Sequence, residues 1–555
     1  MQQCNASSRS DSAFHSQLTG IGGATRIHNS GLPMRRGTFL LRRERREMHV
    51  DNVVESSRLE KLRNIEKLGL DPWGQRFDGH QAIQTILALP ADLPEDQRPR
   101  VKAAGRIVSR RIGGKVHWLD IRDWSGHLTT RKTTSADDKH DATEFSDWSS
   151  RMQVMLGQKQ IGDTGWALAQ ELDLGDLVGI EGTFGKTKRG EPTIFADKLT
   201  MLSKSLEPHP DKWGGMSEME YRLRHRYLDL TYNPELLDVT LKRIKIVRTI
   251  REYLDGRGYC EVETPTLHAI AGGAAARPFK THHNALDIPL FLRIALELHL
   301  KRLLVGGIEK VYEIGRVFRN EGISPKHNPE FTMMELYQAY GNYETMMELT
   351  EGMVLACIDT IGGGHQRKWG EKTIDFTPPW KRMKYADLFK EHVGVAIDDE
   401  PGVSSMAQKA HLDIKGKHHD VLVHELFEHK VEDKLVGPVF VHDYPAALCP
   451  LTKRKAGVPT IAERFELYVH GMELANAYTE LNDPITQEQT FSQQLAGLPE
   501  EDSMAKMDHD FIRAQRHGMP PAGGLGVGID RLVMLLTNTP TIRDVILFPL
   551  LRPEK

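Results

Sequence analysis

Two segments near the middle of the chain alternate their side chains with a period of two, which is typical of β-strands. In the first segment, Arg319 and Glu321 share one face. The second segment, residues 331–337, places four side chains on one face: Phe331, Met333, Glu335 and Tyr337. The polar residues 323–329 between them include two prolines and cannot continue either strand, so the pattern predicts an antiparallel hairpin. One face of this hairpin suits an anion, a cation and a flat ring held side by side.

Residues 101–205 contain short strand-like runs that glycine-bearing turns separate, as in a small barrel. The predicted strands cover residues 101–108, 116–121, 177–184 and 192–196. Basic residues cluster around the strand that carries Trp118: Arg106, Arg110, Arg111, Lys115 and Arg122. Basic side chains beside an exposed ring suit single-stranded bases, because stacking and phosphate contacts add. Trp118 could instead belong to the core of the barrel.

Apolar residues recur at helical spacing in residues 48–70 and again in residues 237–254. The second predicted helix stops just before Gly256 and Gly258, which are typical of a helix end. Residues 208–235, between the barrel and this helix, are rich in charge and contain Pro and Gly. This segment is therefore expected to be a hinge between two domains.

A second hairpin is predicted further along the chain. In residues 473–482, three side chains alternate onto one face: Asn476, Tyr478 and Glu480. Glu473 is out of phase with them, so a bulge between 473 and 476 is needed if all four face one site. A tight turn near Val469 and His470 would set Glu466 of the preceding strand opposite Glu473. Two facing carboxylates suit Mg²⁺, although either glutamate alone could be an ordinary surface residue.

Three other stretches carry candidate chemistry. Residues 271–279 form a loop of small residues, whose backbone a ligand can approach closely. Glu297 lies between apolar neighbours at the start of a predicted helix, where a buried carboxylate needs a cation, and a substrate ammonium would be that partner. Residues 524–534 form a glycine-rich strand that runs into a helix, but their spacing does not fit a dinucleotide-binding fingerprint.

The sequence FRNEG at 318–322, followed by HNPEFTMMELY at 327–337, resembles motif 2 of the class II aminoacyl-tRNA synthetases, in the form carried by lysyl-tRNA synthetases. Residues 258–265 resemble motif 1 of that class and residues 524–534 resemble motif 3, in the right order. Residues 101–205 resemble the anticodon-binding OB domain of class IIb. The sequence MLSKS at 201–205 is similar to a class I signature, but no partner motif precedes it, so we read it as a coincidence.

This resemblance implies an α+β protein with an N-terminal OB-fold β-barrel, followed by a class II catalytic domain built on an antiparallel sheet flanked by helices. The expected organisation is an extension at 1–47, a helical leader at 48–100, an OB-fold domain at 101–207, a hinge at 208–235 and a catalytic domain at 236–555. A polar segment at about 127–150 departs from the family pattern as an insertion within the barrel. Motif 1 implies a homodimer.

The resemblance also assigns site residues. Lysine would contact Gly273, Glu297, Arg319, Glu335, Tyr337, Asn476, Tyr478 and Glu480. ATP would contact Arg319, Glu321, His327, Asn328, Phe331, Glu466, Glu473, Gly526 and Arg531, with Mg²⁺ on Glu466 and Glu473. The implied catalytic residues are Arg319, Glu321, His327 and Arg531, of which Glu321 and His327 could contact either ATP or the acceptor end of tRNA. The anticodon would contact Arg111, Trp118 and Gln153, of which Gln153 follows the insertion.

Aspartyl and asparaginyl enzymes share this class, and the side-chain pocket distinguishes them. A long ammonium needs carboxylates at its far end, whereas aspartate needs a cationic cluster. Glu297, Glu480 and Tyr337 form an anionic end, which favours lysine. The implied reaction is the ATP-dependent activation of L-lysine to lysyl-adenylate, followed by transfer to the 3′ end of tRNA(Lys).

Two other activities could be built on the same catalytic domain. One is a catalytically inactive homologue with an RNA-binding or regulatory role, which is expected to have lost one of four residues that are all present: Arg319, Glu466, Glu473 and Arg531. The other is a paralogue that lysylates a protein, but such paralogues lack the barrel that residues 101–205 provide.

Composition and charge limit the remaining possibilities. The chain has 555 residues, of which 39% are hydrophobic and 27% charged, and it has no apolar run near the roughly 18 residues of a membrane helix. Its four cysteines are Cys4, Cys260, Cys357 and Cys449, and their wide spacing predicts a reducing, cytoplasmic environment without structural zinc. The formal charge of −3 combines +5 in residues 1–47 with −8 in the rest, so a nucleic acid would have to meet a local basic patch.

Residues 1–47 read as a disordered tail, as a start called too early before Met48, or as an organelle-targeting segment.

Overall fold

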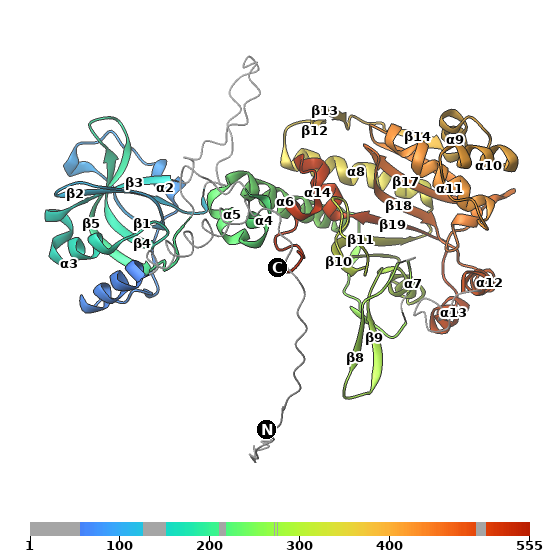
Figure 1. The fold of residues 1–555 in the computed structure, drawn as a ribbon, viewed down its shortest axis with the longest axis horizontal. Coiled ribbons are helices and arrows are strands. Elements are labelled where there is room, and N and C mark those ends of the chain that lie inside the picture. Colours follow the sequence, from blue (N-terminus) through green and yellow to red (C-terminus); the bar gives the residue numbers. More distant parts are fainter. Residues whose placement is uncertain are drawn as a thin grey trace, which may run out of the picture.

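The computed structural model of the chain describes residues 56–125, 151–209 and 218–554, apart from residues 271, 275 and 496–506. The expected N-terminal extension, the insertion at 127–150 and part of the expected hinge lie outside the described residues. Figure 1 shows a barrel and a larger sheet-containing body, with short helices between them. No helix within the described ranges is long and apolar enough to cross a membrane.

The first body is a closed barrel with strands in the order β1-β2-β3-β5-β4. Its elements are β1 (Arg100–Ile112), β2 (Val116–Arg122), β3 (Arg151–Gly157), α3 (Gln158–Glu171), β4 (Leu177–Lys186) and β5 (Pro192–Ser203). A helix at 56–67, α2 (Ile83–Leu87) and η1 (Glu95–Gln97) precede it. Alternate side chains such as Ile107, Leu119 and Val154 fill the interior, which confirms the predicted barrel. Arg122 pairs with Arg151, so β2 and β3 stay in register on either side of residues 126–150.

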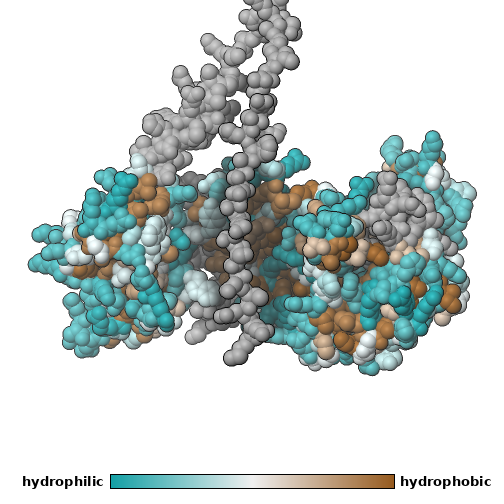
Figure 2. Space-filling model, turned by 90° about the horizontal axis from the view of Figure 1, so that it is seen from below, coloured by the Kyte–Doolittle hydropathy of each residue, from teal (hydrophilic) through white to brown (hydrophobic). Residues whose placement is uncertain are grey.

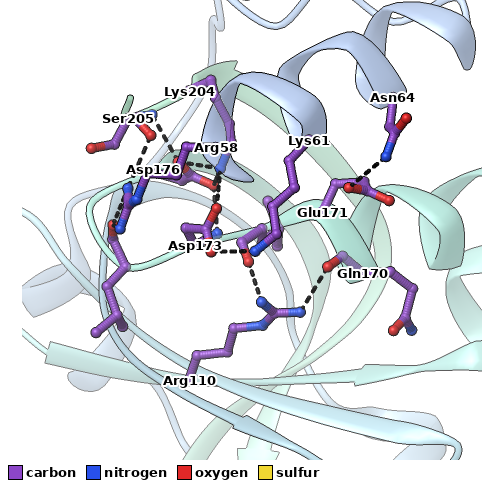
Figure 3. Close-up of polar contacts among 12 residues, drawn as sticks. Arg58, Lys61, Asn64, Arg110, Gln170, Glu171, Asp173, Asp176, Lys204 and Ser205 are labelled. Atoms are coloured by element: carbon purple, nitrogen blue, oxygen red, sulfur yellow. Dashed lines mark hydrogen bonds and ion pairs between the residues drawn. The ribbon is translucent and has the colours of Figure 1, made fainter. Parts of the chain in front are cut away.

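A buried ion cluster fastens the first helix to one end of the barrel (Figure 3). The side chain of Lys204, in the MLSKS sequence, is fully buried and its Nζ lies 2.7 Å from Asp173 and 3.0 Å from Asp176. Lys61 of the helix at 56–67 also pairs with Asp173, at 2.5 Å. Arg58 donates to the backbone carbonyl of Ser205 at 2.9 Å. Lys204 is thus an internal structural cation, in agreement with the interpretation of MLSKS as a coincidence.

Two short helices, α4 (Met219–Arg224) and α5 (Arg226–Tyr232), occupy the described part of the expected hinge. Arg226 is 1% exposed and pairs with the buried Asp229 at 2.8 Å. Its guanidinium also donates to the carbonyls of Leu547 and Arg543, near the C-terminus. The segment is therefore held against the larger body by a buried arginine.

The larger body is built on a 9-stranded sheet in the order β14-β15-β17-β18-β19-β11-β10-β6, with β16 paired to β17. Its strands are β6 (Cys260–Glu261), β10 (Lys310–Phe318), β11 (Glu330–Ala339), β14 (Lys381–Lys384), β15 (Val439–Pro445), β16 (Arg454–Lys455), β17 (Val458–Val469), β18 (Met472–Thr479) and β19 (Ala522–Gly528). The centre of the sheet is antiparallel, as expected, and its two edges add the parallel pairs β14–β15 and β6–β10.

Three helices pack against one face of this sheet: α6 (Pro234–Asp255), α8 (Tyr343–Ile361) and α14 (Ile529–Thr537). The remaining helices are α7 (Glu297–Val305), α9 (Tyr385–Val393), α10 (Glu400–Lys409), α11 (His419–Lys430), η3 (Glu432–Lys434), η4 (Ala446–Leu448), α12 (Pro484–Leu495), α13 (His509–Arg516) and α15 (Ile542–Val545). Small sheets are formed by β7 (Leu267–His268), β8 (Lys280–His283) and β9 (Ile288–Leu292), and by β12 (Gln366–Trp369) and β13 (Lys372–Asp375). The predicted helix at 237–254 is α6.

The first predicted hairpin is β10 and β11, but its first strand ends earlier than expected. Strand β10 stops at Phe318, which pairs with Glu330. Arg319 and Glu321 therefore lie in the connecting loop, and the prediction that they share a strand face is wrong. The backbone NH of Asn320 leaves the sheet and donates to the carbonyl of Arg277 at 2.7 Å.

The second predicted hairpin is β17 and β18, and its bulge is present. Leu467 pairs with Ala475 while Tyr468 pairs with Glu473, so Leu474 is the extra residue. Val469 pairs with Met472, so the turn residues are His470 and Gly471, one residue later than the expected turn at Val469 and His470. The later turn and the bulge together set Glu466 opposite Asn476, and the prediction that it stands opposite Glu473 is wrong.

Replacing Lys204 by Met should destabilise the barrel by about 3–5 kcal/mol, because it leaves buried carboxylates without their cation. Lys198→Met, on strand β5 shortly before Lys204, is the matched control. The Lys198 side chain is 63% exposed in its ion pair with Glu181, so its loss should cost about 1 kcal/mol or less. Calorimetric unfolding of the two variants measures both effects. Equal losses would show that the buried cluster does not hold the barrel together.

Candidate active site

The register of four central strands places site residues in two rows across the sheet. Strands β17, β18, β19 and β11 contribute the first row, which is Arg464, Tyr478, Gly524 and Tyr337. The second row, one alternation further along, is Glu466, Asn476, Gly526 and Glu335. Residues far apart in the sequence therefore meet on one face, on the side of the sheet away from the core residues Leu525 and Val527.

These rows line a cavity of about 620 Å³. The predicted lysine contacts that line it are Gly273, Glu297, Arg319, Glu335, Tyr337, Asn476 and Tyr478. Gly273 has a φ of +87°, a conformation that side-chain-bearing residues rarely adopt. Glu335 is buried and accepts hydrogen bonds from the Leu296 NH at 3.0 Å and the Tyr337 hydroxyl at 3.3 Å. Burial, together with repulsion from Glu297, raises the pKa of Glu335 to about 7.

Glu480 does not line the cavity directly but lies behind its wall, fully buried. Its Oε1 atom has no hydrogen-bond partner in the described part of the chain. A Cβ added at Gly524 would lie 2.0 Å from that oxygen and 2.5 Å from the Tyr337 ring. Only a glycine at this position leaves room for the two side chains.

The structure gives Glu297 a counterion within the chain, which corrects the expectation that only a substrate ammonium could serve. Lys301, one turn later on α7, has its Nζ 2.5 Å from Glu297 Oε1 and 2.5 Å from Glu480 Oε2. The Lys301 side chain is fully buried. Lys301 and the two glutamates therefore form a buried charged triad at the inner end of the cavity.

A second cavity, of about 240 Å³, adjoins the first. The predicted ATP contacts that line it are Arg319, Glu321, His327, Asn328, Phe331, Glu473, Gly526 and Arg531. Arg319 lines both cavities. Its guanidinium lies 5.2 Å from the centre of the Phe331 ring and has no carboxylate partner among the described residues. It is therefore free to meet anions from either side.

His327 holds Arg531 in the second cavity. Arg531 donates to the backbone carbonyl of Glu473 at 2.7 Å and to His327 Nε2 at 3.1 Å. Because Nε2 accepts, the ring proton lies on Nδ1, which is 2.8 Å from Ser324 Oγ. Partial burial and the nearby Arg531 cation lower the pKa of His327, so the ring is neutral at pH 7. Its geometry suits a role in orienting Arg531.

Both predicted metal ligands line the larger cavity, and they differ in how many hydrogen bonds and ion pairs they already make. Glu466 is paired with Arg464 and accepts hydrogen bonds from Tyr444 at 2.8 Å and Tyr468 at 2.6 Å. Although burial opposes ionisation, Arg464 and the two hydroxyls lower the pKa of Glu466, so it is a carboxylate. Three of its roughly four lone-pair positions are filled, which leaves one.

Glu473 is more open, with Asn476 donating to Oε1 at 3.2 Å and Arg531 lying 3.4 Å from Oε2. Within the described ranges, no group of three or more His, Cys, Asp or Glu side chains could hold a metal ion. The two glutamates thus have the oxygen donors that Mg²⁺ prefers, and the ion would take its other ligands from phosphate and water.

Four residues at the site were missed by the sequence reasoning: Lys301, Arg464, Gly524 and Cys449. Arg464 stands two residues before Glu466 on the same strand, so strand alternation could have placed it in the cavity. Lys301 stands four residues after Glu297 on a predicted helix, a spacing that brings the side chains together. No local pattern marks Cys449, which reaches the cavity from a loop.

The predicted anticodon contacts lie together on the outside of the barrel. Arg111 of β1 and Met155 of β3 both pair with Trp118 of β2. Gln153 shares the face of Met155 and accepts a hydrogen bond from Thr193 at 2.9 Å. Trp118 is half-buried and points away from the interior that Leu119 fills, so it is not a core residue.

Three of the five basic residues noted around Trp118 have structural partners instead. Arg106 donates to the carbonyl of Gly175, and Arg122 donates to that of Thr231. Arg110 donates to carbonyls at the end of α3, including those of Ala169 and Gln170 at 3.0 Å each. Arg111 and Lys115, both exposed, are the two that remain, and Arg111 is the one paired with Trp118 across the strands.

The fold and the site define a class of protein. The family model of the tRNA synthetases class II (D, K and N) matches residues 218–552, and the chain belongs to that class. It is 46% identical to the lysine–tRNA ligase of Moorella thermoacetica over 514 residues, which covers 92% of this chain and 100% of that protein. The lysine–tRNA ligases of Syntrophomonas wolfei and Bacillus anthracis are each 45% identical, over 90% of this chain and 97% of their own lengths. Within its class, the chain belongs to the lysine–tRNA ligase family.

Proposed function

We propose that this chain activates L-lysine with ATP and then transfers the lysyl group to the 3′ end of tRNA(Lys), with the residues of the two adjoining cavities in the roles given below. The observation that supports this most directly is the position of Arg319, which lines both cavities. A carboxylate in the larger cavity and an α-phosphate in the smaller one would meet beside this guanidinium. The carboxylate oxygen attacks the α-phosphorus in line, and pyrophosphate leaves.

The larger cavity would hold lysine. Glu335 and the backbone near Gly273 would bind the α-ammonium, while Arg319 and Asn476 would hold the carboxylate. The side chain would run past Tyr337 and Tyr478 towards Glu297 and Glu480. Anionic groups at this inner end disfavour aspartate, because a second carboxylate would be repelled there.

The smaller cavity would hold ATP. Phe331 would stack on the adenine ring, and Arg531, oriented by His327, would contact the γ-phosphate. Glu321 lines the same cavity, which favours a contact with ATP over one with the acceptor end. Positioning and charge neutralisation would therefore account for most of the catalysis.

Mg²⁺ would be held by Glu473 and by the remaining lone pair of Glu466. When bound, the ion neutralises phosphate charge. The chain's own part includes keeping Glu466 ionised, because the Arg464 cation lowers the pKa of that carboxyl.

The barrel would read the anticodon of tRNA through Arg111, Trp118 and Gln153.

The homodimer would form over α6, the helix that precedes motif 1. Ile244 on this helix is 57% exposed and Phe548 is 70% exposed. In Figure 2, hydrophobic surface faces outward between the two bodies, where α4 to α6 lie. We place the enzyme in the cytoplasm, where the free cysteines Cys260, Cys357 and Cys449 would stay reduced.

The direct test is amino-acid-dependent exchange between ATP and pyrophosphate without tRNA. Lysine alone should support exchange, because the inner end of the cavity is anionic, and aspartate and asparagine should not. Exchange with aspartate or asparagine would refute the assignment of the pocket. No exchange with any of the three would favour a catalytically inactive homologue.

Glu480→Gln should raise the KM for lysine in this assay by about tenfold or more and leave the KM for ATP within about twofold. The reason is that the substitution removes a buried charge facing the lysine ammonium, whose hydrogen-bonded pairing is worth about 1.5–3 kcal/mol. Equal increases in both KM values would contradict the pocket assignment.

Trp118→Ala should lower kcat/KM for tRNA aminoacylation by about tenfold while sparing ATP–pyrophosphate exchange. Loss of one stacked base costs about 1–3 kcal/mol, and the barrel does not line either cavity. Trp73→Ala is the control, since Trp73 is 53% exposed and precedes the barrel strands. If exchange fell in step with aminoacylation, the barrel would not be a separate recognition module.

A further inference from the structure

We infer that Lys301 is a positioning residue for amino-acid recognition: its buried ammonium holds Glu297 and Glu480 in place and favours the ionised form of Glu480, which faces the substrate's side-chain cation. This inference rests on the proposed function. It adds a cation of the chain itself to a pocket that was otherwise interpreted as purely anionic.

The geometry of Lys301 favours this role over simple helix packing. Its Nζ lies 2.5 Å from a carboxylate oxygen of each glutamate, and Glu297 is on the same helix while Glu480 follows strand β18. The ammonium is also 5.9 Å from the centre of the Tyr337 ring. One side chain therefore joins α7, the end of β18 and β11 at the inner end of the larger cavity.

Lys301 contacts only one oxygen of each carboxylate. Lys301 contacts Oε1 of Glu297 and Oε2 of Glu480. The other oxygen of Glu480 is buried without a hydrogen-bond partner among the described residues. A buried carboxylate oxygen without a hydrogen-bond partner, next to the floor glycine Gly524, carries a cost in free energy. An ammonium that approaches from the cavity side would offset that cost.

The charges around the triad explain why a cation is needed. Three carboxylates, Glu297, Glu335 and Glu480, and two phenols, Tyr337 and Tyr478, face the same small volume. Burial and repulsion from Glu297 and Glu335 raise the pKa of Glu480 to about 8, even with Lys301 opposing the shift. Despite its burial, the two glutamates raise the pKa of Lys301, so it stays charged. Without Lys301, two like charges would share the site and one would take up a proton.

A protonated Glu480 would be a poor partner for a lysine ammonium. Lysine binding should therefore strengthen as the pH rises through the region in which Glu480 ionises. Removing Lys301 should push that region upward, since a carboxylate that loses its cation holds its proton to higher pH. A residue with a merely structural role would not move this pH dependence.

The test uses Lys301→Met in the full chain, with ATP–pyrophosphate exchange measured from pH 6.5 to 9.5. We expect the KM for lysine at pH 7.5 to rise about tenfold or more, since one unit of pKa shift is a factor of ten. The midpoint of the pH profile of kcat/KM for lysine should move up by about one unit, and the KM for ATP should stay within about twofold. Lys310→Met is the matched control, because Lys310 lies on the neighbouring strand β10 and contacts the Arg257 carbonyl outside the cavities.

Lys301→Arg supplies a second variant, which keeps the charge but changes the shape. It should raise the KM for lysine while leaving the pH midpoint unchanged, and this profile decides the matter if Lys301→Met does not fold. A shifted midpoint in Lys301→Arg, or a wild-type profile in Lys301→Met, would overturn the inference. So would equal increases in the KM values for lysine and ATP. If the unmodified protein shows no lysine-dependent exchange, the proposed function fails instead.

Discussion

The active-site cavity depends on one constraint: the positions of strand β19 that face the cavity are glycines, so the floor of the site carries no side chains. Its glycines lie in register with Tyr337 and Glu335 on one side and with Tyr478 and Asn476 on the other. A methyl group at Gly524 would overlap the side chains that lean over it. The glycines of this segment are therefore required for the depth of the cavity, since only hydrogen atoms leave space for large polar groups above a strand.

Charged side chains in a deep cavity are removed from water, and here they are paired with opposite charges from the protein itself. Glu466 is neutralised by Arg464, and the carboxylates at the inner end share Lys301. The smaller cavity is less acidic than the larger one, because three cations and three carboxylates line it, whereas five carboxylates and two cations line the larger cavity. Arg319 has no carboxylate partner among the described residues, and Arg531 is held chiefly by a backbone carbonyl. The larger cavity therefore favours a cationic amino acid, and the two arginines in the smaller one are available to an anionic nucleotide.

Sequence pattern predicted the main elements of the fold and most of the residues at the site, and its errors have local causes. Alternation alone required a bulge beside Glu473, and the bulge is present at Leu474. The same reasoning set Glu466 opposite Glu473, because it placed the turn one residue too early and did not carry the bulge through to the partner strand. Arg319 was placed on a strand because periodicity does not show where a strand stops; the stop is decided by a backbone hydrogen bond to a loop far away in sequence. Lys301 was missed because a lysine on an amphipathic helix normally faces water.

The barrel shows why residue type alone identifies a nucleic-acid-binding surface less well than the hydrogen-bond partners of those residues do. Arg106, Arg110 and Arg122 look from the sequence like a surface for phosphates, yet each donates to backbone carbonyls of the protein. An arginine whose guanidinium donates to backbone carbonyls cannot turn towards a phosphate without leaving those carbonyls without a hydrogen-bond donor. What remains on this face for a nucleic acid is the ring of Trp118 with Arg111 beside it, together with the exposed Lys115. Recognition there would rest on stacking and directed hydrogen bonds more than on accumulated charge, which is what reading a base, as opposed to a backbone, requires.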